Sequence, residues 1–208
     1  MSSISIIGAG NMARNFASRA LSTGTSVQVI GRNAERTKAL VAELGSGATA
    51  GTWGAAPTGD IVILAVLYQA AVPVVREFGD ALAGKVIVDI TNPFNATATG
   101  LAVPYDTSVA QLVAEVAPED ASVVKAFNTL FSHILASGAP VDVFFAGDDS
   151  AAKKKVAEFI TSIGLRPRDV GELAMAHWVE GLGLVEMGLA RNGLGFNFAM
   201  GVNLAAQE

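Results

Sequence analysis

The sequence predicts an α/β fold in which helices cover both faces of a doubly wound parallel sheet. Apolar segments of strand length alternate with amphipathic segments of helix length along the chain. The apolar segments are nearly continuous, as in DIVILAV at residues 60–66 and KVIVDIT at residues 85–91, which is typical of strands buried on both faces. Hydrophobic residues make up 51% of the 208 residues and charged residues only 16%, which fits a doubly covered sheet and further burial between subunits.

The first half of the chain begins with an apolar strand at residues 3–8. In the segment 12–21, apolar side chains such as Met12 and Phe16 recur at helical spacing, so one face of this helix is apolar. The further elements expected in this half are a strand at 25–30, a helix at 34–44 that Asn33 can cap, a short strand near 47–51, a strand at 60–66, a helix at 70–82 and a strand at 85–91.

The second half continues the alternation and ends in a helical segment. No linker divides the chain, so residues 1–172 are expected to form one domain. Residues 173–208 are fewer than the roughly 50 that an independent domain needs, so they are expected to form a short C-terminal helical extension. The elements expected here are strands at 122–127 and 141–146, a helix at 151–163 with Asp149 and Ser150 before it, an extended piece at 165–171 and a long helix at 174–191.

The segment IIGAGNMA carries Gly8, Gly10 and Ala13 as G-x-G-x-x-A between the first strand and the first helix, the context that raises this motif above chance. Gly8 would allow the tight turn, Gly10 would let the backbone approach a pyrophosphate, and Ala13 would keep helix and strand close. The helix start at Asn11 and Met12 would offer free N–H groups to the phosphates. The motif predicts a Rossmann-type dinucleotide site; the alternative is a glycine turn in another α/β protein.

Arginines, and no early carboxylate, follow the second strand in VQVIGRNAER at residues 27–36. Gly31 and Arg32 stand where an acid would hold the 2′-hydroxyl of NAD. An arginine can instead bind the 2′-phosphate of NADP as a fork. We therefore expect NADP(H) as the cofactor, with Arg32 as its main contact, Arg36 as a helper and Asn33 adding its amide. The alternative is a solvated helix start.

In such sheets the ligand lies beyond the carboxyl ends of the strands. Ala65 and Val66 end one apolar strand and are expected to line the cofactor site. Asn92 and Pro93 form a polar, rigid turn after the next strand, which can hold the nicotinamide carboxamide. The alternative for this pair is an ordinary turn.

Lys125 and Asn128 stand at the end of the apolar strand expected at 122–127. A lysine at such a position needs a partner or water. Lys125 either neutralises an acidic ligand or forms a structural ion pair with Asp89, and the sequence leaves both open. Lys125 and Asn128 are the candidates for positioning the reacting groups.

Several kinds of site are not expected. Cysteine is absent, and His133 and His177 give no metal-binding pattern, so we expect no metal and a structural role for both histidines. Asp148 and Asp149 are interpreted as turn and cap. No nucleophile with an adjacent base stands out, which fits hydride transfer, because there the cofactors carry the chemistry and the protein supplies orientation.

Charge and hydropathy indicate which partners and which cellular location the protein has. A formal net charge of −5 argues against a nucleic-acid partner. The longest apolar run, at residues 61–75, is interrupted by polar residues and is shorter than the roughly 20 residues that span a bilayer. The N-terminus lacks the basic region of a signal peptide. We therefore expect a cytoplasmic protein without a membrane partner.

The motifs IIGAGNMA, GRN, TNPFN, VVKAFNT, FFAGDD, GLRPRDVG and RNGLGFNFAMG follow one another along the whole chain. Together they resemble the deazaflavin-dependent NADP oxidoreductase family, whose members pass a hydride between NADPH and coenzyme F420. The resemblance implies a Rossmann fold with a small C-terminal helical part, a homodimer, and NADP bound with its nicotinamide beside a flavin-like ring. Carried over, it places Asn128, Thr129 and Leu130 near that ring, with the tail at 195–201 approaching it.

The acceptor is where the sequence departs from this family. Well-studied deazaflavin reductases have histidine where Asn128 stands, and KAFN is more similar to the cytosolic domain of six-transmembrane metalloreductases, which pass a hydride from NADPH to a flavin. The expected acceptor is thus a small redox molecule such as deazaflavin F420, FMN or FAD. The alternatives are a reductase of a small carbonyl or imine, with Lys125, Tyr68 or His133 as proton donor, and a non-catalytic NADP sensor.

Overall fold

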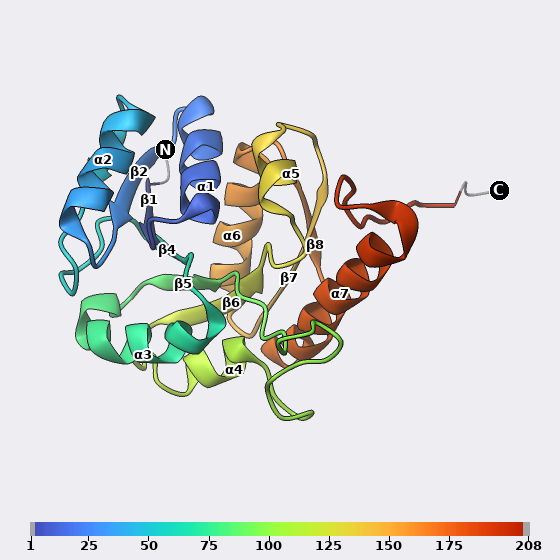
Figure 1. Cartoon of the computed structure of the whole chain (residues 1–208). Helices are drawn as coiled ribbons and strands as arrows, with labels where there is room; N and C mark the ends of the chain where they lie inside the picture. Colours follow the sequence, from blue (N-terminus) through green and yellow to red (C-terminus); the bar gives the residue numbers. More distant parts are fainter. Residues whose placement is uncertain (1–2, 206–208) are drawn as a thin grey trace.

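Eight strands form one sheet in the computed structural model, which describes residues 3–205 (Figure 1). In chain order the strands are β1 (Ser3–Ile7), β2 (Ser26–Ile30), β3 (Ala48–Ala50), β4 (Ile61–Leu64), β5 (Val86–Asp89), β6 (Ser122–Ala126), β7 (Asp142–Gly147) and β8 (Arg166–Asp169). Across the sheet they lie in the order β3-β2-β1-β4-β5-β6-β7-β8. Neighbouring strands are parallel except for the antiparallel pair β6 and β7.

The strand order confirms the predicted Rossmann-type fold class. The run β3-β2-β1-β4-β5-β6 is that of a doubly wound dinucleotide-binding sheet. The order reverses between β1 and β4, and in such sheets ligands bind beyond the carboxyl ends of the strands at this reversal. The antiparallel strand β7 and its parallel partner β8 extend the sheet at one edge. A division of the chain at residue 172 stays a prediction.

Helices cover both faces of this sheet (Figure 1). The helices are α1 (Asn11–Ser22), α2 (Ala34–Leu44), α3 (Tyr68–Phe78), α4 (Val109–Ala114), α5 (Ser132–Ala136), α6 (Ser150–Ser162) and α7 (Ala176–Leu189), with short turns η1 (Gly79–Leu82), η2 (Leu173–Met175) and η3 (Ala190–Leu194). One core packs Phe16 of α1 and Phe159 of α6 against the sheet, and the other packs Val74 and Phe78 of α3. Among residues 3–205, no helix is both long and apolar enough to cross a membrane.

The short helix α4 was not expected from the sequence. It contains six residues, too few for an apolar period to be recognised. A helix had been expected at His133, where the structure has the five-residue helix α5. The helix expected at 70–82 is split, because α3 ends where Gly79 adopts a φ of +46° and η1 follows. The long helix expected at 174–191 consists of η2, α7 and η3.

A buried arginine fixes helix α1 in the fold. The side chain of Arg19 donates hydrogen bonds to the carbonyl oxygens of Ile163 at 2.7 Å, Leu135 at 2.9 Å and Ala139 at 3.1 Å. These acceptors follow or end α5 and α6, where backbone carbonyls lack helical partners. Arg19 thereby satisfies them and holds α1 against the C-terminal ends of both helices, which fixes the direction in which α1 points.

Candidate functional site

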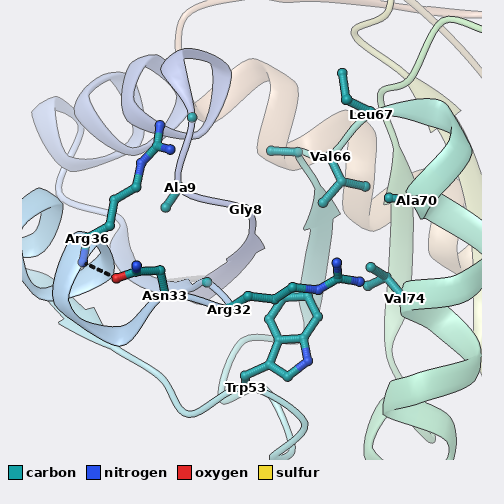
Figure 2. A pocket seen from close by; sticks show the side chains of 13 residues that line it. Gly8, Ala9, Arg32, Asn33, Arg36, Trp53, Val66, Leu67, Ala70 and Val74 are labelled. Carbon is teal, nitrogen blue, oxygen red and sulfur yellow. Dashed lines mark hydrogen bonds between the residues drawn. The ribbon is translucent and has the colours of Figure 1, made fainter.

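A cleft of about 350 Å³ opens beyond the carboxyl ends of β1, β2 and β4 (Figure 2). It lies at the reversal of strand order, where a ligand is expected. The cleft brings together eight of the residues predicted to bind a cofactor. Its lining consists of Gly8, Ala9, Gly10, Gly31, Arg32, Asn33, Arg36, Trp53, Ala65, Val66, Leu67, Ala70 and Val74.

Gly8 makes the turn between β1 and α1 possible. Its φ is +133°, and a Cβ added there would lie 2.2 Å from the carbonyl oxygen of Ala65 at the end of β4. Its N–H donates to the carbonyl oxygen of Ile30 at 2.8 Å. Both the backbone angle and the contact exclude a side chain, so Gly8 is required by the fold itself.

Gly10 is different, because the fold does not require a glycine there. Its backbone is extended, and apart from its two chain neighbours no heavy atom of residues 3–205 lies within 4 Å of the position of a Cβ. That Cβ would project into the open space in front of α1. Asn11, Met12 and Ala13 form the first turn of α1, whose N–H groups have no acceptor within the helix. The arrangement fits a phosphate ligand, which needs both a close backbone and free N–H groups.

At Gly31 the packing leaves no room for a side chain, because a Cβ there would lie 2.5 Å from Thr37 Oγ1. Asn33 caps α2, as predicted: its Oδ1 accepts the N–H of Arg36 at 2.9 Å. The two arginine side chains are exposed and point apart, Arg36 towards α1 and Arg32 across the cleft towards Val74 (Figure 2). Exposed side chains can turn towards a ligand without breaking buried contacts.

Trp53 lines the cleft but was missed in the sequence. It lies in the connection after β3, and its Nε1–H donates to Glu77 Oε1 on α3 at 2.5 Å. The guanidinium carbon of Arg32 lies 5.0 Å from the centre of the Trp53 ring. A lone tryptophan in a segment rich in Gly, Thr and Pro was the only available signal, and it does not indicate a site by itself.

Asn92 and Asn128 form a reciprocal pair beyond the ends of β5 and β6. Asn128 Nδ2 donates to Asn92 Oδ1 at 3.0 Å, and Asn92 Nδ2 donates to the carbonyl oxygen of Asn128 at 2.7 Å. Asn128 Nδ2 also donates to the carbonyl oxygen of Val179 on α7 at 2.8 Å. A Cβ at Gly183 of α7 would lie 2.9 Å from Asn92 Oδ1. The two amides therefore join both strand ends to α7, and the adjoining Pro93 is buried.

Lys125 is fully buried in a cluster with two carboxylates. Its Nζ donates to Asp89 Oδ2 at 2.8 Å, Glu180 Oε1 at 2.8 Å and the carbonyl oxygen of Thr91 at 2.5 Å. The ion pair with Asp89, one of the two alternatives, is thus present, and these acceptors use all three ammonium protons. Burial raises the pKa of Glu180, whereas the charge of Lys125 lowers it. Glu180 was missed because it lies on α7, far away in the sequence.

The histidines and the Asp148–Asp149 pair considered in the sequence contact backbone groups or a neighbouring ring. His177 Nδ1 lies 2.8 Å from the carbonyl oxygen of Thr107, and the exposed ring of His133 stacks on Phe131. Asp149 Oδ1 caps α6 by accepting the N–H of Ala152. Asp148 Oδ1 accepts the N–H of Leu173 at 2.7 Å. The Asp149 cap is confirmed, and a structural role for the two histidines stays a prediction.

The C-terminal tail folds back onto the loop after β6. The ring of Phe131 meets those of Phe196 and Phe198 edge to face, at 5.5 and 5.7 Å between centres. Beneath the tail, Glu186 of α7 is only 3% exposed, and its Oε1 has no hydrogen-bond partner among residues 3–205. Burial raises the pKa of Glu186 to about 8, although a backbone hydrogen bond from Met200 opposes the shift. Glu186 was also missed in the sequence.

Known proteins resemble the chain along most of its length. Residues 3–93 match the family of NADP oxidoreductases, coenzyme F420-dependent. Over 185 residues the chain is 33% identical to Metalloreductase STEAP3 of Rattus norvegicus, which covers 87% of this chain and 36% of that protein. Over 144 residues it is 35% identical to the F420-dependent NADP reductase of Methanocaldococcus jannaschii, which covers 65% of this chain and 64% of that protein. The chain thus spans less than two thirds of either relative.

A solved structure extends the comparison to the complete fold. That of a proposed F420-dependent NADP reductase from Arthrobacter sp. has a TM-score of 0.87, with 98% of this chain and 100% of that chain covered at 24% identity. This identity is low enough that the likeness shows the fold alone. The resemblance recognised in the sequence, to deazaflavin-dependent reductases and to metalloreductases, is confirmed by these matches.

The buried Glu186 predicts a stability that falls as the pH rises. Its folded pKa of about 8 lies above the ordinary value of 4.5, so the folded state holds a proton that the unfolded chain releases. Its contribution is fully present below about pH 4.5 and is lost as the pH rises through about 8, with a slope of up to about 1.4 kcal/mol per pH unit. Urea unfolding across this range should show a flatter profile for Glu186→Gln. The exposed Glu158→Gln is the control, and parallel profiles for wild type and Glu186→Gln would contradict the prediction.

Proposed function

Because residues 3–93 match the family of NADP oxidoreductases, coenzyme F420-dependent, we propose that the protein is an NADPH-dependent oxidoreductase with a flat redox ring as its hydride acceptor. The cofactor binds in the cleft of Figure 2. The observation that carries the proposal is Gly10, whose missing side chain leaves space in front of the first turn of α1 although no neighbouring atom demands it. A phosphate group explains that choice of residue.

The cleft orients the cofactor along the sheet. The pyrophosphate lies against Gly8, Gly10 and the first turn of α1, and the 2′-phosphate lies beside Arg32, Asn33 and Arg36. From there the cofactor passes Ala65 and Val66 towards the ends of β5 and β6. When bound, NADPH supplies a hydride from its nicotinamide ring. The residues of the chain bind, orient and shield this ring.

Asn92, Pro93 and Asn128 hold the nicotinamide end of the site. Their amides tie the strand ends to α7, so the wall beside the ring is rigid. Lys125 acts behind this wall as a positioning residue, since its ammonium holds the carbonyl of Thr91 immediately before Asn92. Rigid placement is what hydride transfer demands of a protein.

The acceptor proposed is a flavin-like or deazaflavin ring bound near Asn128, Thr129 and Leu130. The loop that follows β6 carries Phe131, which packs against Phe196 and Phe198 of the tail. Such aromatic surfaces suit a flat conjugated ring. The alternative, reduction of a small carbonyl or imine, needs a proton donor. The ammonium protons of Lys125 are already used by protein acceptors, so Tyr68 or His133 would have to supply the proton.

We further propose that the protein is a homodimer joined through the outer face of α7. Trp178, Val185 and Leu189 of this helix are 56%, 53% and 40% exposed. Gly181 and Gly188 lie on the same helix, and apart from the adjoining backbone of α7 no heavy atom of residues 3–205 lies within 4 Å of a Cβ placed there. Exposed apolar side chains interspersed with glycines allow a second helix to approach closely.

Replacement of Arg32 tests the cofactor preference. Arg32→Ala should weaken NADP+ binding about tenfold to a hundredfold, because each charged hydrogen bond contributes roughly 1.5–3 kcal/mol, and should leave NAD+ binding nearly unchanged. Isothermal titration with both dinucleotides measures this. Lys38→Ala, a substitution elsewhere on α2, is the control. Equal losses for NADP+ and NAD+ would show that Arg32 does not contact the 2′-phosphate.

The acceptor is tested by rapid mixing. NADPH-loaded protein is mixed separately with coenzyme F420, FMN and FAD, and the loss of the NADPH absorbance is followed. We expect at least one of these rings to oxidise the bound NADPH at roughly 1–1000 per second, the range typical of enzymes. If none reacts while NADPH remains bound, the carbonyl reductase and the sensor become the better interpretations.

Sedimentation tests the dimer. Wild-type protein should sediment as a dimer, and Val185→Glu should weaken association about tenfold or more, because it places an unpaired charge in an apolar interface. Thr161→Glu, on the exposed side of α6, is the matched control and should leave the dimer intact. A monomeric wild type would contradict the proposed interface.

A further inference from the structure

Three side chains from separate segments meet at the edge of the cleft. Arg32 follows β2, Trp53 follows β3 and Glu77 belongs to α3. The guanidinium carbon of Arg32 lies 5.0 Å from the centre of the Trp53 ring, and its Nη2 lies 3.7 Å from Glu77 Oε2. Trp53 Nε1–H donates to the other carboxylate oxygen of Glu77 at 2.5 Å. Each member of this triad therefore contacts the other two.

The triad has an anchored side and an open side. The Trp53 ring is fixed at its edge by Phe78, at 5.1 Å between ring centres and 77° between planes. The aromatic face attracts a guanidinium, so Trp53 keeps Arg32 extended across the cleft, as Figure 2 shows. The side chain of Arg32 is nonetheless 62% exposed. A guanidinium carries five N–H donors, and Glu77 faces only one end of it, so donors remain for a ligand in the cleft.

Glu77 and a 2′-phosphate compete for the same group. The carboxylate lies beside the guanidinium in the free protein, and a phosphate bound to Arg32 would bring a second negative charge to it. A phosphate that accepts two parallel N–H bonds outcompetes a carboxylate that touches one end of the fork. The competition concerns only a cofactor with a 2′-phosphate, because the 2′-hydroxyl of NAD carries no charge.

Resting on the proposed function, we propose that Trp53 and Glu77 tune the selectivity of the site for NADP over NAD. Trp53 is a positioning residue that holds Arg32 extended across the cleft. Glu77 is a built-in competitor that holds the guanidinium while the cleft is empty and yields it to the 2′-phosphate. The carboxylate lowers NADP affinity and leaves NAD affinity unaffected, and the indole raises NADP affinity.

The decisive variant is Glu77→Gln, which keeps an oxygen acceptor for Trp53 Nε1–H and removes the negative charge. Isothermal titration should show NADP+ binding about two- to fivefold tighter, the range expected for an exposed ion pair, with NAD+ binding unchanged. Glu158→Gln is the control: it removes the same charge from the exposed face of α6 and should leave both affinities unchanged.

Trp53→Leu tests the other half of the inference. It should weaken NADP+ binding about two- to fivefold or more, the range for an exposed cation–π contact, and weaken NAD+ binding less. In a Trp178→Phe background, Trp53 is the sole tryptophan, and its fluorescence should change on titration with NADP+. This readout requires no turnover.

The outcomes separate this inference from the proposed function. If the wild type binds NADP+ but Glu77→Gln binds it no tighter, or gains equally for NAD+, the role of Glu77 is refuted and the NADP site stands. If Trp53→Leu weakens NADP+ and NAD+ equally, the role of Trp53 in selectivity is refuted. If the wild type binds neither dinucleotide, the proposed function and this inference fall together.

Discussion

The close approach of the β1–α1 turn to the end of β4 is the contact on which the rest of the site depends. Gly8 lies so near Ala65 that any side chain would overlap its carbonyl oxygen at 2.2 Å. The contact brings the first turn of α1 to the point where the strand order reverses, which is where parallel sheets leave a crevice. Arg19 fixes the other end of the helix. The direction of α1, and hence of its free N–H groups, is set from both ends.

The two ends of the proposed cofactor site are held in different ways. At the nicotinamide end, Lys125 and the pair Asn92–Asn128 are held between β5, β6 and α7 by hydrogen bonds of 2.8 and 3.0 Å, those of Lys125 being buried. Removing one partner from such a buried ion cluster costs roughly 3–5 kcal/mol, so this wall has little freedom. Beside Asn33, at the opposite end, the side chain of Arg36 is exposed, and that of Arg32 is held only by exposed contacts with Trp53 and Glu77. Rigidity thus lies where the ring must be placed, and adaptability lies where the charge is recognised.

Much of the fold and half of the site could be predicted because their signals are local. The G-x-G-x-x-A turn, the Asn33 cap and the buried strands depend on residues near one another in the sequence, and the structure reproduces all three. Glu77, Glu180 and Glu186 could not be predicted, because their environment is created by segments far away in the chain. The local sequence of an amphipathic helix does not distinguish a carboxylate that becomes buried in the fold from one that stays exposed. Helix α4 could not be predicted for another reason, because its six residues do not complete a recognisable apolar period.

The central claim is that this cleft recognises a 2′-phosphate on an adenine nucleotide. The most direct measurement compares the binding of adenosine 2′,5′-bisphosphate and adenosine 5′-monophosphate to the free wild-type protein by calorimetry. The bisphosphate carries the phosphate in question and no nicotinamide, so the acceptor and the reaction play no part. The account predicts that it binds about a hundredfold tighter or more, as two charged hydrogen bonds imply. Equal affinities for the two nucleotides would contradict it.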